Sequence, residues 1–203
     1  MKAISLTLLV SLLFTGCFTL RPATHEYTIL PSYTAVQPIA QPIDATVKIS
    51  ATRSIPSLSS TQFYYLKGSS NISAYLYSRW SDTPSNMIDR SLYSMLQNQH
   101  LFTALVPAAS SATADLVLES DLNAFYHRFH DGTNSEGFID ITYRLIDPKT
   151  KKTMASKRFV ITEPSPSEDA SGGVVALNHA THELSNQCIS WLSINLKENT
   201  WKK

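Results

Sequence analysis

The sequence predicts an α+β domain in which two helices pack on one face of a mainly antiparallel sheet. Strand-like alternation of apolar and polar residues recurs through three successive segments between residues 114 and 162. Two further segments, one after residue 83 and one near the end of the chain, carry apolar residues at helical spacing. Hydrophobic residues make up 43% of the chain, which is enough for a buried core. This order of elements is typical of helices layered on a sheet.

The first strands of the domain are predicted by alternation and by turn residues. Residues 46–49 alternate with the strand period. Residues 62–67 and 72–80 flank a Gly-Ser-Ser-Asn turn at 68–71 and therefore predict a β-hairpin. A helix is then expected with Thr83 as its N-cap and Pro84 at its first position.

The second half of the chain predicts a meander and a long helix. A short strand is expected at 102–106, followed by three antiparallel strands between 114 and 162 that are separated by turns at 131–134 and 147–150. The last helix carries an apolar stripe that we expect to lie in the core. Its members are Val174, Leu177, Thr181, Leu184, Cys188, Trp191 and Leu192.

The N-terminus has the layout of a secretory signal peptide. Lys2 is followed by a short, largely apolar run at residues 4–14 and then by small residues. The run is too short to cross a bilayer, which takes about 20 apolar residues. Residues 14–17, Phe-Thr-Gly-Cys, resemble the lipobox of bacterial lipoproteins, in which acyl chains such as palmitate modify the cysteine. The alternative is an ordinary cleaved signal that happens to precede Cys17.

The predicted organisation has three parts. Residues 1–16 form the signal peptide, residues 17–44 the lipidated N-terminus and tether, and residues 45–203 the folded domain. The tether from residue 18 is rich in proline and could extend about 80 Å. Residues 27–30 are β-prone, and their pairing with the domain would shorten that reach. If Cys17 carries lipid, Cys188 has no partner and is expected to be a buried free thiol.

Composition and motifs exclude several classes of function. Lys2 is the one charged residue of the cleaved segment, so the basic residues of the mature chain equal its 16 acidic ones. No net charge therefore attracts nucleic acid. We find no Gly-x-Ser-x-Gly elbow and no phosphate-binding loop, so we expect no enzymatic activity and no cofactor.

The histidines do not predict a metal site. His179 and His182 share one face of the last helix, but a zinc site usually takes three or four protein ligands. His127 and His130 are an odd number of residues apart in a predicted strand, which places them on opposite faces. We therefore expect no bound metal.

One strand face is a candidate interface. Tyr75, Tyr77 and Arg79 alternate along the second hairpin strand and share one face. If Leu76 and Trp80 face the core, the Tyr-Tyr-Arg face points outward or toward another subunit, and these residue types are enriched at protein interfaces. A solvated face is the competing interpretation.

Several motifs follow one another along the chain in a particular order. They are the lipobox at 14–17, residues 75–80, which lead into a helix start, and then Ala114–Leu118, Tyr143–Leu145 and Ser190–Leu192. In this order they resemble the ABC-type transport auxiliary lipoproteins of the paraquat-inducible protein C type, and the resemblance covers nearly the whole chain. The Arg79-Trp80 pair beside the helix start is the best single marker. The helix entry at 81–84, Ser-Asp-Thr-Pro, departs from the acidic-small pair typical of the family.

The resemblance implies a non-enzymatic subunit of a lipid transport system built on mammalian-cell-entry domains. Its partner would be the tunnel protein of that system, and its role would be to maintain membrane integrity. Phe18, rather than Asp, after Cys17 implies the periplasmic face of the outer membrane. Two other functions stay open, namely an activator or assembly factor of another envelope complex, and a periplasmic lipid carrier with a cavity between sheet and helices. Homo-oligomerisation stays open as well.

Overall fold

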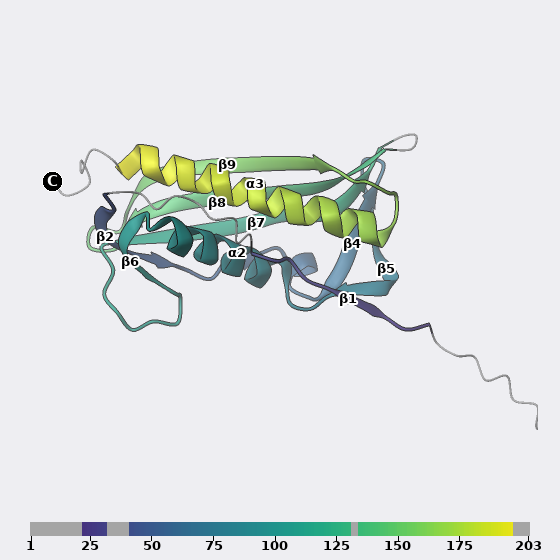
Figure 1. Cartoon of the computed structure of the whole chain (residues 1–203), viewed down its shortest axis with the longest axis horizontal. Helices are drawn as coiled ribbons and strands as arrows, with labels where there is room; N and C mark the ends of the chain where they lie inside the picture. The colour runs from purple at the N-terminus through teal and green to yellow at the C-terminus, as the bar shows by residue number, and fades with distance from the viewer. Residues whose placement is uncertain (1–21, 32–40, 131–133, 197–203) are drawn as a thin grey trace, which may run out of the picture.

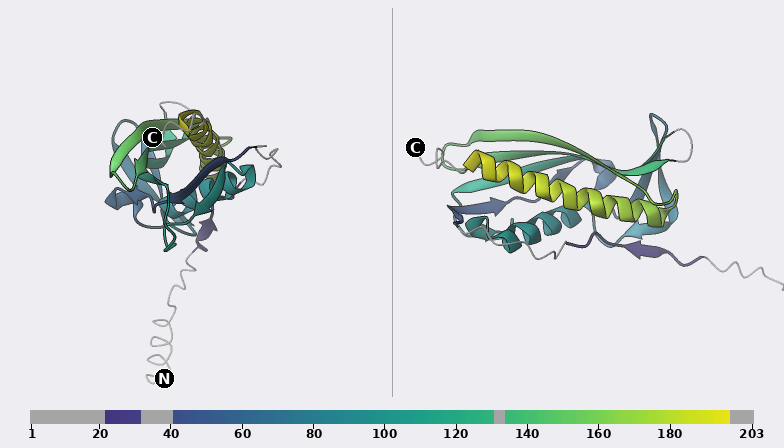
Figure 2. Two further views of the ribbon diagram at one scale, coloured as in Figure 1. Left: turned by 90° about the vertical axis from the view of Figure 1, so that its left-hand side faces the viewer. Right: turned by 45° about the horizontal axis from the view of Figure 1, so that its top comes forward.

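The computed structural model describes residues 22–31, 41–130 and 134–196 as a curved sheet with two helices along its open side (Figures 1 and 2). The strands are β1 (His25–Tyr27), β2 (Ile43–Ile49), β3 (Arg53–Ser54), β4 (Gln62–Lys67), β5 (Asn71–Trp80), β6 (Phe102–Val106), β7 (Leu116–Phe129), β8 (Ser135–Asp147) and β9 (Lys152–Pro164). The helices are a short 3-10 turn, η2 (Pro56–Leu58), and two α-helices, α2 (Pro84–Gln99) and α3 (Ala170–Leu196).

The predicted meander is confirmed. Strands β7, β8 and β9 pair antiparallel over almost their whole length, with Leu118 opposite Leu145 and Ile139 opposite Ile161. Every second side chain of β8, and of β7 as far as Leu122, is buried beneath the helices, because side chains alternate along a strand. A register shift near Asn123 interrupts this alternation in β7, and residues 124–127 are all buried.

The prediction of a mainly antiparallel sheet is wrong. The sheet is mixed, because β7 is long enough to pair in parallel with three separate strands along its other edge. In turn along that edge, β2 pairs with residues 116–118, β3 with 121–122 and β4 with 127–129. Strand β6 also runs parallel to β2, and helix α2 lies on the connection that leads back to it. Parallel neighbours need such long connections, and no local turn signal marks them.

The start of α2 follows the sequence prediction. Thr83 has an extended backbone, and its side chain accepts a hydrogen bond from the backbone amide of Asn86. Pro84 occupies the first helical position, where its missing amide hydrogen costs no hydrogen bond. The helix ends at His100, which adopts a left-handed conformation with φ of 51°.

Helix α3 lies across β7, β8 and β9 and buries the predicted stripe apart from Val174, which is partly buried (Figure 1). Leu184 and Cys188 are fully buried, and Trp191 is 8% exposed with its ring centroid 6.1 Å from that of Phe159. A glycine lets the helix approach β8 closely, since a Cβ on Gly137 would lie 2.7 Å from the α3 backbone. Among the described residues, no helix has the length and apolar character needed to cross a bilayer.

Part of the predicted tether is docked on the domain. Strand β1 pairs in parallel with residues 78–80 at the end of β5. Ile29 is 4% exposed, and the Leu30 backbone amide donates to the Asn178 side-chain oxygen on α3 at 3.0 Å. The expected pairing of this segment with the domain is confirmed, although the strand begins at His25, two residues before the predicted segment 27–30.

Candidate functional site

The three residues of the predicted outward stripe on β5 do not share one environment, because Tyr75 is partly buried and Tyr77 and Arg79 are exposed. Tyr75 is half-buried and packs on Phe63 and Tyr65, with ring centroids 4.9 Å apart in both pairs. Leu76 does not face the core with Trp80, because Leu76 is 78% exposed and Trp80 is 1% exposed. The prediction that Tyr75 points outward and Leu76 inward is therefore wrong.

A register shift in the hairpin explains the reversal. Gln62 lies opposite Arg79, and Tyr64 lies opposite Ala74, so β5 holds three more residues than β4 between these pairs. An odd number of extra residues reverses the alternation of side chains between the two faces. Residues 75 and 80 therefore both point inward.

The other two stripe residues remain at the surface. Tyr77 is 45% exposed. The Arg79 guanidinium lies 3.3 Å from the Glu26 carboxylate of β1, and both side chains are more than half exposed. An exposed ion pair of this kind contributes little to stability. The interface role of Tyr75, Tyr77 and Arg79 stays a prediction, and only the last two have accessible side chains for it.

A buried polar contact lies beneath the hairpin. The Tyr75 hydroxyl and His127 Nδ1 share a 2.7 Å hydrogen bond, and the His127 side chain is fully buried. Burial lowers the pKa of His127 to about 4, an effect that Asp169 partly opposes. The ring is neutral at physiological pH and serves the packing of α3, whose Gly173 lies directly against it. His130, by contrast, lies just beyond the end of β7 and is half exposed, so the two histidines are apart, although not on opposite faces of one strand as predicted.

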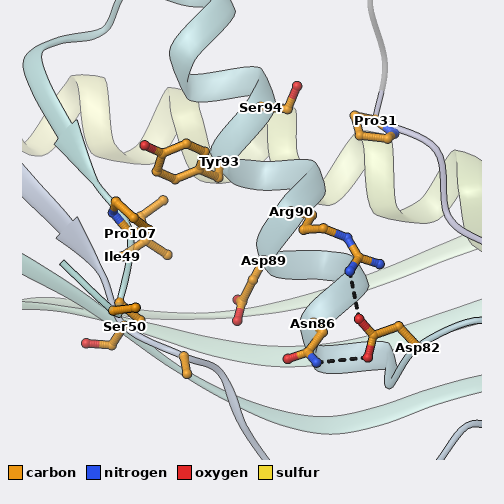
Figure 3. Close-up of a pocket in the computed structure, with 13 residues that line it drawn as sticks. Pro31, Ile49, Ser50, Asp82, Asn86, Asp89, Arg90, Tyr93, Ser94 and Pro107 are labelled. Atoms are coloured by element: carbon orange, nitrogen blue, oxygen red, sulfur yellow. Dashed lines mark hydrogen bonds and ion pairs between the residues drawn. The ribbon is translucent and has the colours of Figure 1, made fainter.

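An open groove of about 560 Å³ lies between α2, the end of β2 and the loop that joins β6 to β7 (Figure 3). Its walls are mainly apolar. Tyr93 lies across from Ile49 and Pro107 in Figure 3, and Pro31 borders the groove from the docked N-terminal segment. The Tyr93 hydroxyl is engaged, since it donates to the Leu105 carbonyl at 3.2 Å.

Asp89 forms the polar floor of the groove. Its carboxylate accepts hydrogen bonds from the Thr52 backbone amide at 2.9 Å and from the Thr52 hydroxyl at 2.5 Å. The Thr52 hydroxyl also contacts the Ser120 hydroxyl at 2.5 Å. Burial raises the pKa of Asp89, and the two Thr52 hydrogen bonds oppose that shift. This network ties α2 to the sheet.

The polar rim of the groove is also paired internally. Arg90 donates to one oxygen of Asp82 at 2.7 Å, and the Asn86 amide donates to the other at 2.9 Å, as Figure 3 shows. The hydrogen bond from Asn86 is the main reason that the pKa of Asp82 is lowered. Because its charged groups are satisfied from within, the groove presents chiefly an apolar surface to a ligand. No sequence motif marks it, since Thr52 and Asp89 come together only in the fold.

The remaining predicted candidates lie apart from this groove. His179 and His182 border a separate open hollow with Glu183 and Glu163. Across the parts of the chain that the structure describes, no three His, Cys, Asp or Glu side chains are grouped to hold a metal ion. Cys188 is a buried free thiol as predicted, and burial raises its pKa, which makes it unreactive. Cys17 lies outside the described residues.

Comparison with solved structures shows the fold. Protein XCC0632 of Xanthomonas campestris, assigned to family DUF330, matches with a TM-score of 0.79 and 16% identity over 87% of this chain and 99% of that one. An uncharacterized protein matches with a TM-score of 0.66 and 13% identity over 84% and 99%. The hypothetical protein CT253 of Chlamydia trachomatis matches with a TM-score of 0.52 and 10% identity over 75% and 98%. No curated protein matches the sequence.

Comparison with family models identifies the family. The model of the ABC-type transport auxiliary lipoprotein component matches residues 27–188, which run from the end of β1 into α3. This range holds the meander, the hairpin and the groove, so the match covers most of the domain that the sequence resemblance indicated, without the lipobox and residues 190–192. The chain belongs to the family of ABC-type transport auxiliary lipoprotein components.

Proposed function

We propose that this protein is a lipid-anchored accessory subunit of an ABC-type lipid transport system and has no catalytic chemistry of its own. The family match over residues 27–188 is the observation that carries this proposal. The groove supports it, because a mainly apolar surface whose charged groups are paired internally suits recognition better than proton transfer.

The finer proposal concerns the partner and the membrane. The protein acts on the periplasmic face of the outer membrane, beside the tunnel protein of a system built on mammalian-cell-entry domains, and helps to maintain membrane integrity. Two sequence features support this location, namely the lipobox that ends at Cys17 and the Phe at position 18. The family resemblance supports the partner class.

The anchor is tested with Cys17→Ser, compared with the matched control Cys188→Ser. Labelled palmitate should be incorporated by the wild type and by Cys188→Ser and not by Cys17→Ser. On a density gradient that separates the two membranes, wild-type protein should follow the outer membrane, whereas Cys17→Ser should be released as periplasmic protein. Palmitate labelling of Cys17→Ser, or wild-type protein in the inner-membrane fractions, would contradict the corresponding part of the proposal.

A second candidate function, a periplasmic lipid carrier, is favoured by the groove itself. Its volume of about 560 Å³ lies within the range of small-molecule sites, about 300–1,000 Å³. The lipid would bind in this groove and not in the expected cavity between sheet and helices, because packed side chains such as Leu177, Leu184 and Tyr143 fill that space. Extraction and mass spectrometry of purified protein should recover stoichiometric lipid if this function holds. Ala51→Trp, which fills the groove, should then abolish recovery.

A further inference from the structure

The docking of β1 fixes how far the domain can lie from the site of lipidation. His25 follows Cys17 by eight positions. A fully extended chain gains at most about 3.6 Å per residue, so β1 begins within about 29 Å of Cys17. An undocked tether would have allowed about 80 Å. A lipid on Cys17 therefore holds the domain close to the bilayer.

The β4–β5 hairpin lies at the end of the domain where the described chain begins. In Figures 1 and 2 the described chain enters β1 at the end that holds β4 and β5, and α3 finishes at the opposite end. The pairing gives the same direction. His25 lies opposite Ser78 in a parallel pair, so the chain that precedes His25 leads toward the β5 residues that precede Ser78.

The hairpin carries exposed apolar side chains at this end. Leu76 is 78% exposed, and Ile72 and Tyr77 are each 45% exposed; we call these three residues, which lie along the free edge of β5 rather than on one of its faces, the hairpin patch. Within the described ranges, β1 pairs only with residues 78–80, so the β5 edge from 71 to 77 has no strand on that side. An exposed apolar edge of this kind is available for contact with another surface.

The charges around the hairpin patch do not select a charged partner. Arg79 is paired with Glu26, Arg128 is paired with Glu136, and Lys67 lies over the Phe129 ring. Leucine, isoleucine and tyrosine are suited to the boundary between lipid headgroups and acyl chains, where a tyrosine keeps its hydroxyl in water. Lipid is also the surface that the short anchor brings nearest.

We propose that the hairpin patch rests on the lipid surface of the membrane that holds Cys17. This inference rests on the lipid anchor of the proposed function and adds the orientation of the domain. The β4–β5 end faces the bilayer, and the opposite end, with the β6–β7 loop and the end of α3, points away from it. Contact is made by apolar side chains, so it is insensitive to salt and does not require anionic lipid.

A single fluorescent label tests this orientation. Ala74→Cys is the labelled variant, because residue 74 is exposed between Ile72 and Leu76 and the substitution leaves the hairpin patch intact. Ile194→Cys is the matched control, since Ile194 is 73% exposed near the far end of α3. Buried Cys188 will not react with the label.

The lipidated full-length protein is placed in phosphatidylethanolamine–phosphatidylglycerol vesicles that contain a lipid-bound quencher just below the headgroups. The label at residue 74 should be quenched several-fold more than the label at 194, equally at low and high salt. Leu76→Asp in the Ala74→Cys background should remove most of that difference while circular dichroism stays unchanged.

Three results would overturn the proposal. The first is equal quenching at the two positions. The second is a label at residue 74 that the lipid-bound quencher does not reach and that becomes less accessible as the protein density on the vesicles rises. This result would show that a second copy of the protein covers the hairpin patch. The third is failure of the protein to float with vesicles, which would remove the anchor and with it the proposed function. The first two leave partner capture intact, so they separate a wrong orientation from a wrong function.

Discussion

Asparagine in place of His127 should flatten the dependence of folding stability on pH. The His127 side chain is fully buried, bonded to the Tyr75 hydroxyl, and packed on Phe129 with ring centroids 4.4 Å apart. Asparagine can keep an acceptor near the position of Nδ1 but does not titrate. The variant therefore isolates the contribution of the imidazole proton.

The magnitude follows from the pKa of His127, which is about 4 in the folded protein against an ordinary value of 6.5. The unfolded chain binds the proton more tightly, so this stabilisation is complete above pH 6.5 and is lost as the pH falls through about 4. Between about pH 7.5 and about pH 4.5 the wild type should lose about 2.5 kcal/mol from this one group. Asp121 contributes little in this window, because its ordinary pKa of 3.8 and its folded-state pKa of about 2, lowered by hydrogen bonds from two arginines, both lie below it.

Urea unfolding at three pH values across this window measures the effect. His127→Asn should be less stable than wild type at neutral pH, because it leaves space around the lost ring, and the two proteins should converge as the pH falls. If the free energies of unfolding of the two proteins change with pH in the same way, His127 is not a buried, neutral group in the folded protein.

Four further substitutions test the packing. Trp191→Ala should lower the free energy of unfolding by about 3 kcal/mol, and an unchanged melting midpoint would show that the indole is exposed. Gly137→Ala should cost about 3 kcal/mol in urea unfolding, because its Cβ meets the α3 backbone, and a neutral effect would contradict that close approach. Tyr75→Ala should destabilise the domain by about 3 kcal/mol, whereas Tyr77→Ala should change the free energy of unfolding by no more than about 0.5 kcal/mol. Thermal melting measures both, and equal losses of stability would mean that the two side chains are equally buried.

The elements of the fold could be predicted because each has a local cause. Thr83 and Pro84 start α2, the turn after Lys67 makes the hairpin, and the alternating residues of β7 and β8 make the meander. The parallel pairings could not be predicted, because they join segments far apart in the chain without a turn between them. The length of β7, which accommodates three neighbours along one edge, became visible only in the fold.

The candidate site was harder to predict for the same reason. The alternation of β5 gave the correct strand but the wrong face for Tyr75 and Leu76, because the register shift against β4 leaves no mark in the sequence. The groove depends on Thr52 reaching Asp89 across 37 positions, which no motif records. Cys17, by contrast, is predicted from a short continuous motif, since the lipidation signal is local.

Capture of the protein with its neighbours from cross-linked cell envelopes tests the proposed function most directly. Tagged full-length protein is cross-linked in living cells, purified in detergent under denaturing washes, and identified together with its bound proteins, with Cys17→Ser as the unanchored control. We expect recovery of a mammalian-cell-entry tunnel protein, with the permease and ATPase of the same system, and reduced recovery from the control. Recovery of a wall-synthesis enzyme in place of these subunits, or of no protein beyond the tagged one, would contradict it.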